Sequence, residues 1–471
     1  MSFRVVPDLE RPSQIHIVGI GGAAMSAVAS ILVALGHRVT GSDQADSSTV
    51  ANLGALGIEV SIGHRAQNVG DAELLAVSTA IRADNPELNA ALLRGIPVAG
   101  RPEIMEALGR LRQTIAISGT HGKTTTTAMT VLARSINGAA PSFIVGGLVR
   151  QLGTGVRWTA DSTELIVEAD ESDGSFLRFR ANSTVVNNIE EDHLDYWGSM
   201  GALEAAFDAF VLQSGGPNIV SLDDAGARRL ATRIRTKGGS VVTTGVSADA
   251  DYRIVAFEAQ GLQSQFTVER NGQQLVDMSL RVPGLHNARN AVNALAVAVE
   301  MGGSPNEVAA ALATFTGVGR RFEWRAEVNG VTFVDDYAHL PTEVAATVQA
   351  AVGGGWDRVI AVFQPHRFTR VQSVGSLFAD SFVGADLVVV TGLYAAGQAP
   401  IEGVSAAIVA DAVTAAHPRQ RVVLIEDRDS LLSFLADELR PGDLCLSMNA
   451  GDLTTLPDQM LAHPWARRGG R

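Results

Sequence analysis

The chain has 471 residues, and its composition of 46% hydrophobic and 18% charged residues is typical of a globular protein. This length exceeds that of an ordinary single domain and predicts about three domains. The formal net charge of −13 argues against a nucleic-acid-binding protein, because binding phosphate backbones needs clustered lysine and arginine.

The N-terminal segment, residues 1–14, is polar and contains Pro7 and Pro12, so it does not resemble a signal peptide. No apolar run approaches the roughly 20 residues that a membrane-spanning helix needs. The single cysteine, Cys445, lies in an apolar run and is interpreted as a buried structural thiol, which fits a reducing compartment. We therefore expect a cytoplasmic protein without membrane insertion.

The first glycine-rich turn follows a predicted strand at residues 15–18 and precedes a predicted helix at residues 23–35. Gly19, Gly21 and Ala24 have the spacing of the dinucleotide-binding pattern, and Asp43 follows about 20 residues later. Backbone amides at such a turn and helix N-terminus bind phosphate groups. By itself the pattern is weak and is also compatible with an NAD-dependent dehydrogenase.

A second glycine-rich segment follows the predicted strand at residues 114–117 and opens a helix, as a phosphate-binding loop does. The loop is compressed, because Ser118 stands without the glycine that usually lies four residues before Gly122. Lys123 is one of only two lysines in the chain, the other being Lys237. These features predict that ATP binds through backbone amides, the lysine and hydroxyl groups. The residues of the predicted loop are Gly119, Thr120, His121, Gly122, Lys123, Thr124 and Thr125.

Two further predicted strands end in polar segments. Residues 168–173 contain four carboxylates, which predict a cation or a polar network, although a solvated acidic turn is the alternative. His193, in the second segment, is either a metal ligand or a helix-capping partner. Asn287 and Asn290 lie three residues apart at the start of a predicted helix, where they can bind a ligand or cap the helix.

Strands that alternate with helices predict an α/β fold with mostly parallel sheets, which bind ligands beyond the carboxyl ends of the strands. From residue 251 to 282 the polar and apolar residues alternate, which predicts antiparallel strands forming an added sheet. We expect three domains: residues 1–113, 114–320 and 321–471.

The motifs Gly-Thr-His-Gly-Lys-Thr from Gly119, Glu-Ala-Asp-Glu-Ser-Asp from Glu168 and Asn-Ile-Glu-x-Asp-His-Leu-Asp from Asn188 together resemble those of the Mur ligase family. The resemblance implies a Rossmann-like UDP-binding domain, a central ATPase domain and a C-terminal Rossmann-like domain. It implies that ATP phosphorylates the lactyl carboxylate of UDP-N-acetylmuramate and that L-alanine attacks the acyl phosphate to form an amide. The implied cation is Mg²⁺, with Mn²⁺ as a substitute.

The resemblance also implies roles for individual residues. The UDP-substrate residues are Gly19, Gly21, Gly22, Met25, Ser26, Asp43, Ser78, Thr79 and Arg101. Beyond the phosphate loop, the ATP residues are Asn287, Asn290, Arg321, Asp336 and Tyr337. The implied metal ligands are Thr124, Glu168 and His193, and the amino-acid residues are His339, His366, Arg367 and Arg370. The catalytic set is Lys123, Glu168, His193, Arg321 and Asp336.

Ala24 and Ala27 replace glycines that are usual in the family's first glycine-rich motif, and three further positions depart from the family pattern in the third domain. Leu340 replaces a second histidine, Gln398 replaces a glutamate, and Asn449 replaces a glycine. Two alternatives therefore stay open: a recycling ligase that attaches a preformed tripeptide to the same nucleotide, and a non-catalytic nucleotide-binding regulator. Because an acyl phosphate hydrolyses in water, the resemblance also implies domain closure before chemistry. The protein is expected to be a monomer or a homodimer.

Overall fold

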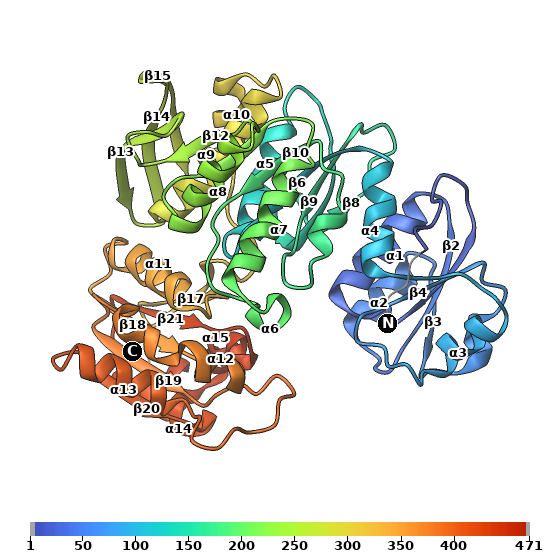
Figure 1. Ribbon diagram of the computed structural model, residues 1–471. Helices are drawn as coiled ribbons and strands as arrows, with labels where there is room; N and C mark the ends of the chain where they lie inside the picture. Colours follow the sequence, from blue (N-terminus) through green and yellow to red (C-terminus); the bar gives the residue numbers. More distant parts are fainter. Residues whose placement is uncertain (1–4, 468–471) are drawn as a thin grey trace. The chain divides into compact units, whose positions relative to one another are not determined.

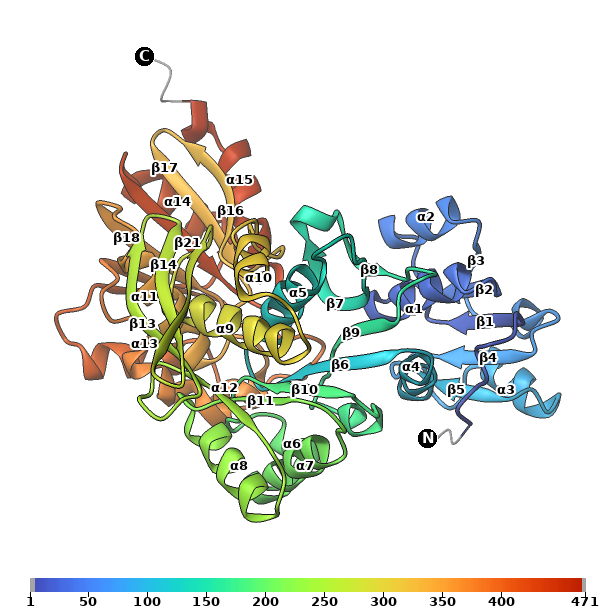
Figure 2. The same ribbon diagram turned by 90° about the horizontal axis from the view of Figure 1, so that it is seen from above.

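The computed structural model describes residues 5–467 and confirms the α/β class with mostly parallel sheets (Figures 1 and 2). The chain divides into two compact units. The first unit comprises Met1–Ile254, Val268–Val276 and Arg289–Leu312, and the second comprises Val255–Thr267, Asp277–Ala288 and Ala313–Arg471. The three domain ranges expected from the sequence stay a prediction. Within residues 5–467, no helix has the length and apolar character needed to cross a membrane.

The first unit begins with a five-stranded parallel sheet of order β3-β2-β1-β4-β5. Its strands are β1 (Gln14–Val18), β2 (Arg38–Asp43), β3 (Glu59–Ile62), β4 (Leu74–Val77) and β5 (Val98–Gly100). The helices that alternate with them are α1 (Ala23–Ala34), α2 (Ser48–Ala55), α3 (Pro86–Leu93) and α4 (Arg101–Arg110). Because β2 and β4 flank β1 on opposite sides, the turn after β1 lies at the point where the strand order reverses. In open α/β sheets this is the usual place for a ligand.

A ten-stranded sheet has the order β15-β14-β13-β12-β11-β10-β6-β9-β7-β8. Its strands up to β12 are β6 (Gln113–Ser118), β7 (Ser142–Val149), β8 (Thr154–Arg157), β9 (Glu164–Glu168), β10 (Ser183–Val186), β11 (Asn218–Ser221) and β12 (Val242–Gly245). The helices of this region are α5 (Lys123–Arg134), α6 (Leu194–Trp197), α7 (Met200–Leu212), α8 (Ala225–Thr236), α9 (Leu285–Glu300) and α10 (Pro305–Leu312). β6 lies between β9 and β10 and is parallel to both, so the polar segments that follow these three strands meet at one edge.

The alternating segment forms β13 (Tyr252–Gln260), β14 (Gln263–Arg270) and β15 (Gln273–Leu280). The expectation of a separate added sheet was wrong, because these strands continue the ten-stranded sheet. The physical reason is the pairing of Thr244 with Tyr252 and of Gly245 with Arg253, which joins β13 in parallel to β12. The boundary between the two units runs through β13–β15.

The second unit contains a six-stranded sheet of order β16-β17-β21-β18-β19-β20, parallel except for the β16–β17 pair. Its strands are β16 (Glu323–Val328), β17 (Val331–Asp336), β18 (Arg358–Phe363), β19 (Leu387–Thr391), β20 (Val422–Ile425) and β21 (Asp443–Met448). Its helices are α11 (Pro341–Val352), α12 (Phe368–Val374), α13 (Ala407–Ala416), α14 (Arg428–Glu438) and α15 (Leu456–Ala462). Cys445 is buried in β21, as predicted.

Candidate active site

The phosphate loop connects β6 to α5 and depends on two glycines. Gly119 has φ +132° and Gly122 has φ +75°, conformations that side chains disfavour. A Cβ at Gly122 would lie 2.8 Å from Oδ1 of Asn290 and 3.0 Å from Nδ2 of Asn187. Gly122 is also the N-cap of α5 and provides no side-chain cap. The first-turn amides of α5 are therefore not used by a capping side chain, which suits an anion.

Two asparagines after β10 fix the shape of this loop. The backbone N of His121 donates to Oδ1 of Asn188 at 2.7 Å, and Nδ2 of Asn187 donates to the carbonyl of His121 at 3.0 Å. The hydroxyl of Thr120 accepts from the backbone N of Glu190 at 2.9 Å. Asn188 was identified in the sequence only as the start of a motif, and the role of the two asparagines in shaping the loop was not predicted. The parallel register of β6 and β10 was the signal that could have revealed it.

Lys123 forms a buried ion pair that sequence analysis also missed. Its Nζ lies 2.8 Å from Oε2 of Glu171 and donates to the carbonyl oxygen of Gly119 at 2.8 Å. Burial opposes the charge on Lys123, but the carboxylates of Glu171 and Asp170 raise its pKa above the ordinary value. Lys123 is therefore charged at neutral pH and already lies against its own loop.

The structure brings two of the three predicted metal ligands into direct contact. The hydroxyl of Thr124, in the first turn of α5, donates to Oε1 of Glu168 at 3.1 Å. Oε2 of Glu168 accepts from the backbone N of Gly146 at 2.9 Å. His193 has φ +54° and forms its ion pair with Asp192 at 3.3 Å. Within residues 5–467, no group of three or more His, Cys, Asp or Glu is arranged to hold a metal.

The two asparagines of α9 differ in their surroundings. Asn290 lies against Gly122 of the phosphate loop, as the close approach of its Oδ1 shows. One turn further along the helix, Nδ2 of Asn293 donates to Oδ1 of Asn187 at 3.0 Å and so supports the same loop. Asn287 donates from Nδ2 to the carbonyl oxygen of Pro283 at 2.7 Å, a local bond at the start of its helix.

The predicted UDP turn has a similar design. The backbone N of Gly19 donates to the carbonyl oxygen of Ser42 at 2.8 Å, and that of Gly21 donates to Oδ2 of Asp43 at 2.8 Å. A Cβ at Gly21 would lie 2.9 Å from the same carboxylate oxygen, so glycine is needed for this close approach. Gly22 caps α1 without a side chain, which leaves amides of the first turn for a phosphate group.

The other residues predicted for this turn vary in exposure. Ser26 is half-buried on α1, Ser78 is half-buried after β4, and Thr79 is exposed beside it. Met25 is 2% exposed and belongs to the hydrophobic core of the domain, so its side chain is packed inward. Arg101 opens α4 and pairs with Asp173 at 3.2 Å.

In the second unit, the predicted ATP residues cluster at the carboxyl end of β17. The carboxylate of Asp336 accepts from the backbone N of Phe322 at 2.6 Å and from that of Ala338 at 2.7 Å. Burial raises the pKa of Asp336 to about 6, against the opposing effect of the Arg321 charge. The guanidinium of Arg321 lies 5.1 Å from the centre of the Tyr337 ring, a cation–π distance.

The predicted amino-acid residues form a cluster of rings and guanidinium groups. The rings of His339 and His366 are 6.0 Å apart, and His366 stacks on Tyr394 at 5.8 Å with an interplanar angle of 9°. Nη1 of Arg370 lies 3.0 Å from Nδ1 of His366. Because arginine only donates, Nδ1 of His366 must be the unprotonated acceptor. Burial, together with the charge of Arg370, lowers the pKa of His366 to about 4, so the imidazole is neutral at pH 7.

Arg367 stands at the N-cap of α12 with φ +65° and ψ +132°, a conformation rare for a residue with a side chain. Two of the positions that depart from the family pattern, Gln398 and Leu340, adjoin residues of this cluster. Gln398 accepts from the backbone N of Thr369 at 3.2 Å and donates to its hydroxyl at 3.0 Å. Leu340 is 6% exposed and is the N-cap of α11, whose Glu343 accepts from its backbone N at 3.3 Å.

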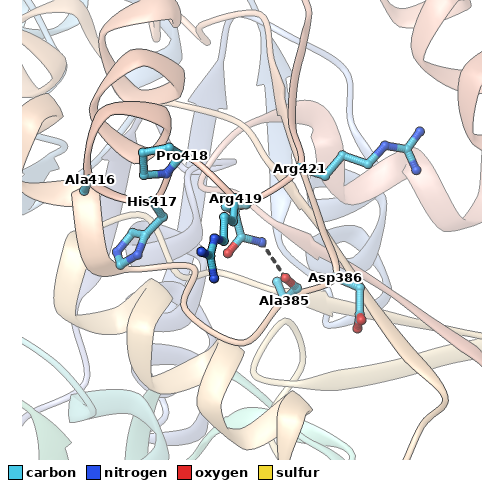
Figure 3. Close-up of a pocket in the computed structure, with 8 residues that line it drawn as sticks. Ala385, Asp386, Ala416, His417, Pro418, Arg419 and Arg421 are labelled. Atoms are coloured by element: carbon cyan, nitrogen blue, oxygen red, sulfur yellow. Dashed lines mark hydrogen bonds between the residues drawn. The ribbon is translucent and has the colours of Figure 1, made fainter.

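A cavity of about 530 Å³ in the second unit is lined by residues between α13 and β20 and before β19 (Figure 3). It lies at the amino ends of β19 and β20, whereas the predicted site residues follow the carboxyl ends of β17 and β18. Its Arg421 pairs with Glu438 at 2.7 Å, and its His417 pairs with Asp380 at 2.8 Å. This cavity is therefore separate from the predicted site.

Comparisons with known proteins agree over most of the chain. Residues 14–113 match the Mur ligase family catalytic domain, residues 117–298 the Mur ligase middle domain, and residues 320–451 the Mur ligase glutamate ligase domain. UDP-N-acetylmuramate–L-alanine ligase of Rhizobium meliloti is 42% identical over 458 residues, covering 95% of this chain and 96% of that protein. The enzyme of that name from Nitratidesulfovibrio vulgaris is 43% identical over 451 residues, covering 95% of this chain and 98% of its own.

The solved structures lead to the same conclusion. The UDP-N-acetylmuramate–alanine ligase of Thermotoga maritima superposes with a TM-score of 0.79 at 28% identity, covering 96% of this chain and 98% of its own. A murein peptide ligase of Psychrobacter arcticus has a TM-score of 0.65 at 24% identity, with 96% and 98% covered, and shows the shared fold. With matched domains over most of its length and relatives above 40% identity, the chain belongs to the Mur ligase family.

Proposed function

We propose that this chain joins L-alanine to the lactyl carboxylate of UDP-N-acetylmuramate, with ATP converted to ADP and phosphate. The observation that carries the proposal is the near-full-length identity of about 40% to ligases of that name, together with a phosphate loop that contains Lys123. The product is an amide of a peptidoglycan precursor. We propose the cytoplasm as its compartment, because the reaction consumes ATP.

ATP is proposed to bind through the backbone amides of residues 119–125, with Lys123 at its terminal phosphates. The buried Lys123 is charged, and its attraction for phosphate is strong in a site of low polarity. Asn290, on α9, lies against Gly122 of this loop. In the second unit we propose that Arg321 and Asp336 contact the nucleotide and that Tyr337 stacks on its base. His121, Thr120, Thr125 and Asn287 complete the proposed nucleotide set.

Thr124 and Glu168 are proposed to hold a divalent cation, which we take to be Mg²⁺. The hydroxyl and carboxylate oxygens, 3.1 Å apart, are the hard ligands that Mg²⁺ prefers. Mg²⁺ commonly uses only one or two carboxylates and takes further oxygens from phosphates, so a sparse set of protein ligands fits. His193 is the third proposed ligand. When bound, the cation would neutralise charge on the phosphates during transfer.

Glu168→Gln is expected to raise the Mg²⁺ concentration for half-maximal phosphate release by at least about tenfold, because the amide is a weaker ligand than the carboxylate. A Mg²⁺ titration of phosphate release measures the change, and EDTA should stop the reaction reversibly. Glu164→Gln is the matched control: it changes the other end of β9, where Glu164 pairs with Arg134. An unchanged Mg²⁺ requirement in Glu168→Gln would exclude Glu168 as a ligand.

The two substrates are proposed to bind in different domains. The pyrophosphate of UDP-N-acetylmuramate would lie on the turn at Gly19, Gly21 and Gly22, where α1 has no side-chain cap. Ser26, Asp43, Ser78, Thr79 and Arg101 are the other proposed contacts. L-Alanine would bind beside His339 and His366, with its carboxylate held by Arg367 and Arg370 through paired hydrogen bonds.

Phosphate release tests the proposal directly. The purified protein is mixed with ATP, Mg²⁺ and UDP-N-acetylmuramate, and L-alanine, glycine, L-serine or the preformed tripeptide is added in separate reactions. We expect release that depends on both the nucleotide sugar and L-alanine, with mass spectrometry showing the alanine amide. Release only with the tripeptide would replace the proposal with the recycling reaction. No release with any acceptor would favour a non-catalytic regulator.

A further inference from the structure

Two residues of the turn before β16 have left-handed backbone conformations. Arg320 has φ +59° and Phe322 has φ +44°, and neither is glycine. Such conformations cost on the order of 1–3 kcal/mol each and persist only where surrounding contacts hold them. Arg321, the arginine proposed to contact the nucleotide, lies between these two residues. The contacts that hold this turn therefore set the backbone position of Arg321, from which its side chain extends.

Asn449 provides several of these contacts and is fully buried. Its Oδ1 accepts from Nη2 of Arg320 at 2.9 Å and from the backbone N of Thr454 at 3.1 Å. Its Nδ2 donates to Oδ1 of Asp335 at 3.0 Å, and its carbonyl oxygen accepts from Arg320 at 3.0 Å. We call Arg320, Asp335, Asn449 and Thr454 the Asn449 network. A glycine at this position would keep the backbone bond from Arg320 but has no side chain for the other three.

Asp335 is the buried charge at the centre of the Asn449 network. It is 0% exposed and accepts from the hydroxyl of Thr454 at 2.6 Å and from that of Ser447 at 2.9 Å. Nε of Arg320 lies 3.6 Å from its second oxygen. Removing a hydrogen-bond partner from a buried carboxylate is costly, because the charge is then left without compensation. Asn449 therefore links the anion of β17 to the arginine of the strained turn.

The network continues to Tyr337 through Arg320. The carbonyl oxygen of Arg320 accepts from the backbone N of Tyr337 at 2.9 Å, and its guanidinium lies 4.9 Å from the Tyr337 ring centre. Arg321 lies at 5.1 Å from the same ring centre and 3.8 Å from Glu343. The two adjacent arginines thus differ: the guanidinium of Arg320 donates hydrogen bonds to Asn449 at 2.9 and 3.0 Å, whereas that of Arg321 pairs with Glu343 and lies over the Tyr337 ring.

We propose that Asn449 and Arg320 are positioning residues that fix Arg321 and Tyr337 for the nucleotide, while Arg321 alone of the two arginines contacts phosphate. This inference rests on the proposed function. Asn449 is then a working part of the nucleotide site of this chain, although it departs from the family pattern. Misplacement of a catalytic group by about 1 Å can cost on the order of 100-fold in rate.

Steady-state kinetics of Asn449→Gly and Asn449→Ala test the proposal. We expect kcat/KM for ATP to fall about 10- to 100-fold, while KM for UDP-N-acetylmuramate stays within about twofold. Asn329→Gly is the matched control: Asn329 has φ +54° in the β16–β17 turn and donates to the carbonyl oxygen of Trp465 at 2.9 Å. It removes an amide hydrogen bond from the same sheet without touching the Asn449 network, and its kinetics should match the wild type.

A double variant separates positioning from general destabilisation. Asn449→Gly combined with Arg320→Gln should be little worse than the more damaged single variant, because both act through the same contact. A loss of folded protein would instead lower the midpoint of thermal unfolding and give a kcat that returns to the wild-type value on cooling, and that result would overturn the proposal. Wild-type kinetics in Asn449→Gly would also overturn it.

The inference about Asn449 can be tested even if the proposed function fails. If the wild type releases no phosphate with any acceptor, calorimetry with a non-hydrolysable ATP analogue tests the same variants. The inference then requires that Asn449→Gly bind the analogue at least about tenfold more weakly than Asn329→Gly. Equal affinities of the two variants, or a wild type that binds no analogue, would overturn the inference.

Discussion

Lys123→Ala is expected to reduce phosphate release by at least about 1000-fold, to the limit of detection. Removing one preorganised donor to developing charge commonly costs 100- to 1000-fold, and Lys123 carries a full charge. Its ammonium group donates to the carbonyl oxygens of Gly119 and Thr120, so it already lies within the loop that would surround the phosphates. A phosphate-release assay at saturating substrates measures the effect.

The chain offers a matched control for this variant, because Lys237 is its only other lysine. Lys237 follows α8, is 51% exposed and pairs with Asp208 at 2.7 Å. Without Lys237 the buried Asp208 keeps its second partner, Arg233, at 2.9 Å, so Lys237→Ala should keep wild-type turnover.

Lys123→Ala leaves Glu171 buried without its partner, so folding must be checked by thermal unfolding. Lys123→Arg keeps the charge in a different geometry and should also turn over slowly while remaining folded. Turnover near the wild-type rate in Lys123→Ala would remove the basis of the proposed function.

The sequence predicted those parts of the site that depend on local pattern. The phosphate loop, the turn at Gly19 and the strands before them follow from glycines placed between an apolar strand and a helix. Glu171 was not predicted as the partner of Lys123, because 48 residues separate the two and several carboxylates of the motif were equivalent. The supporting bonds of Asn187 and Asn188 span 66 and 67 residues and depend on strand register, which a local pattern does not contain.

Asn449 shows that a local pattern also cannot tell whether a substitution fits the folded structure. In the sequence Asn449 replaces the glycine that is usual in the family, and this departure left alternative functions open. In the structure its amide bonds to Asp335, 114 residues away, and to Arg320, 129 residues away. Whether a substitution fits depends on partners that come together only on folding. Likewise, the alternation in residues 251–282 predicted strands, but not that β13 would pair with β12 and continue the central sheet.

Arg321→Ala is expected to lower kcat by about 1000-fold, the lower end of the range for arginines that stabilise phosphoryl transfer. KM for ATP should change less than kcat, because most of the stabilisation is gained as charge develops in the transition state. The structure favours Arg321 over Arg320 for this role, since Arg320 donates to both oxygens of Asn449.

Arg421→Ala is a suitable control for Arg321→Ala, because Arg421 is 52% exposed in the same unit and pairs with Glu438. It lies at the amino end of β20, away from the carboxyl end of β17, and its loss should leave kcat unchanged. Arg321→Lys keeps the charge but loses the planar fork, so its kcat should fall between those of Arg321→Ala and the wild type. If Arg321→Ala instead raised KM for ATP with an unchanged kcat, Arg321 would serve binding alone. In that case the stabilisation of the transferring phosphate would rest on Lys123 and the cation.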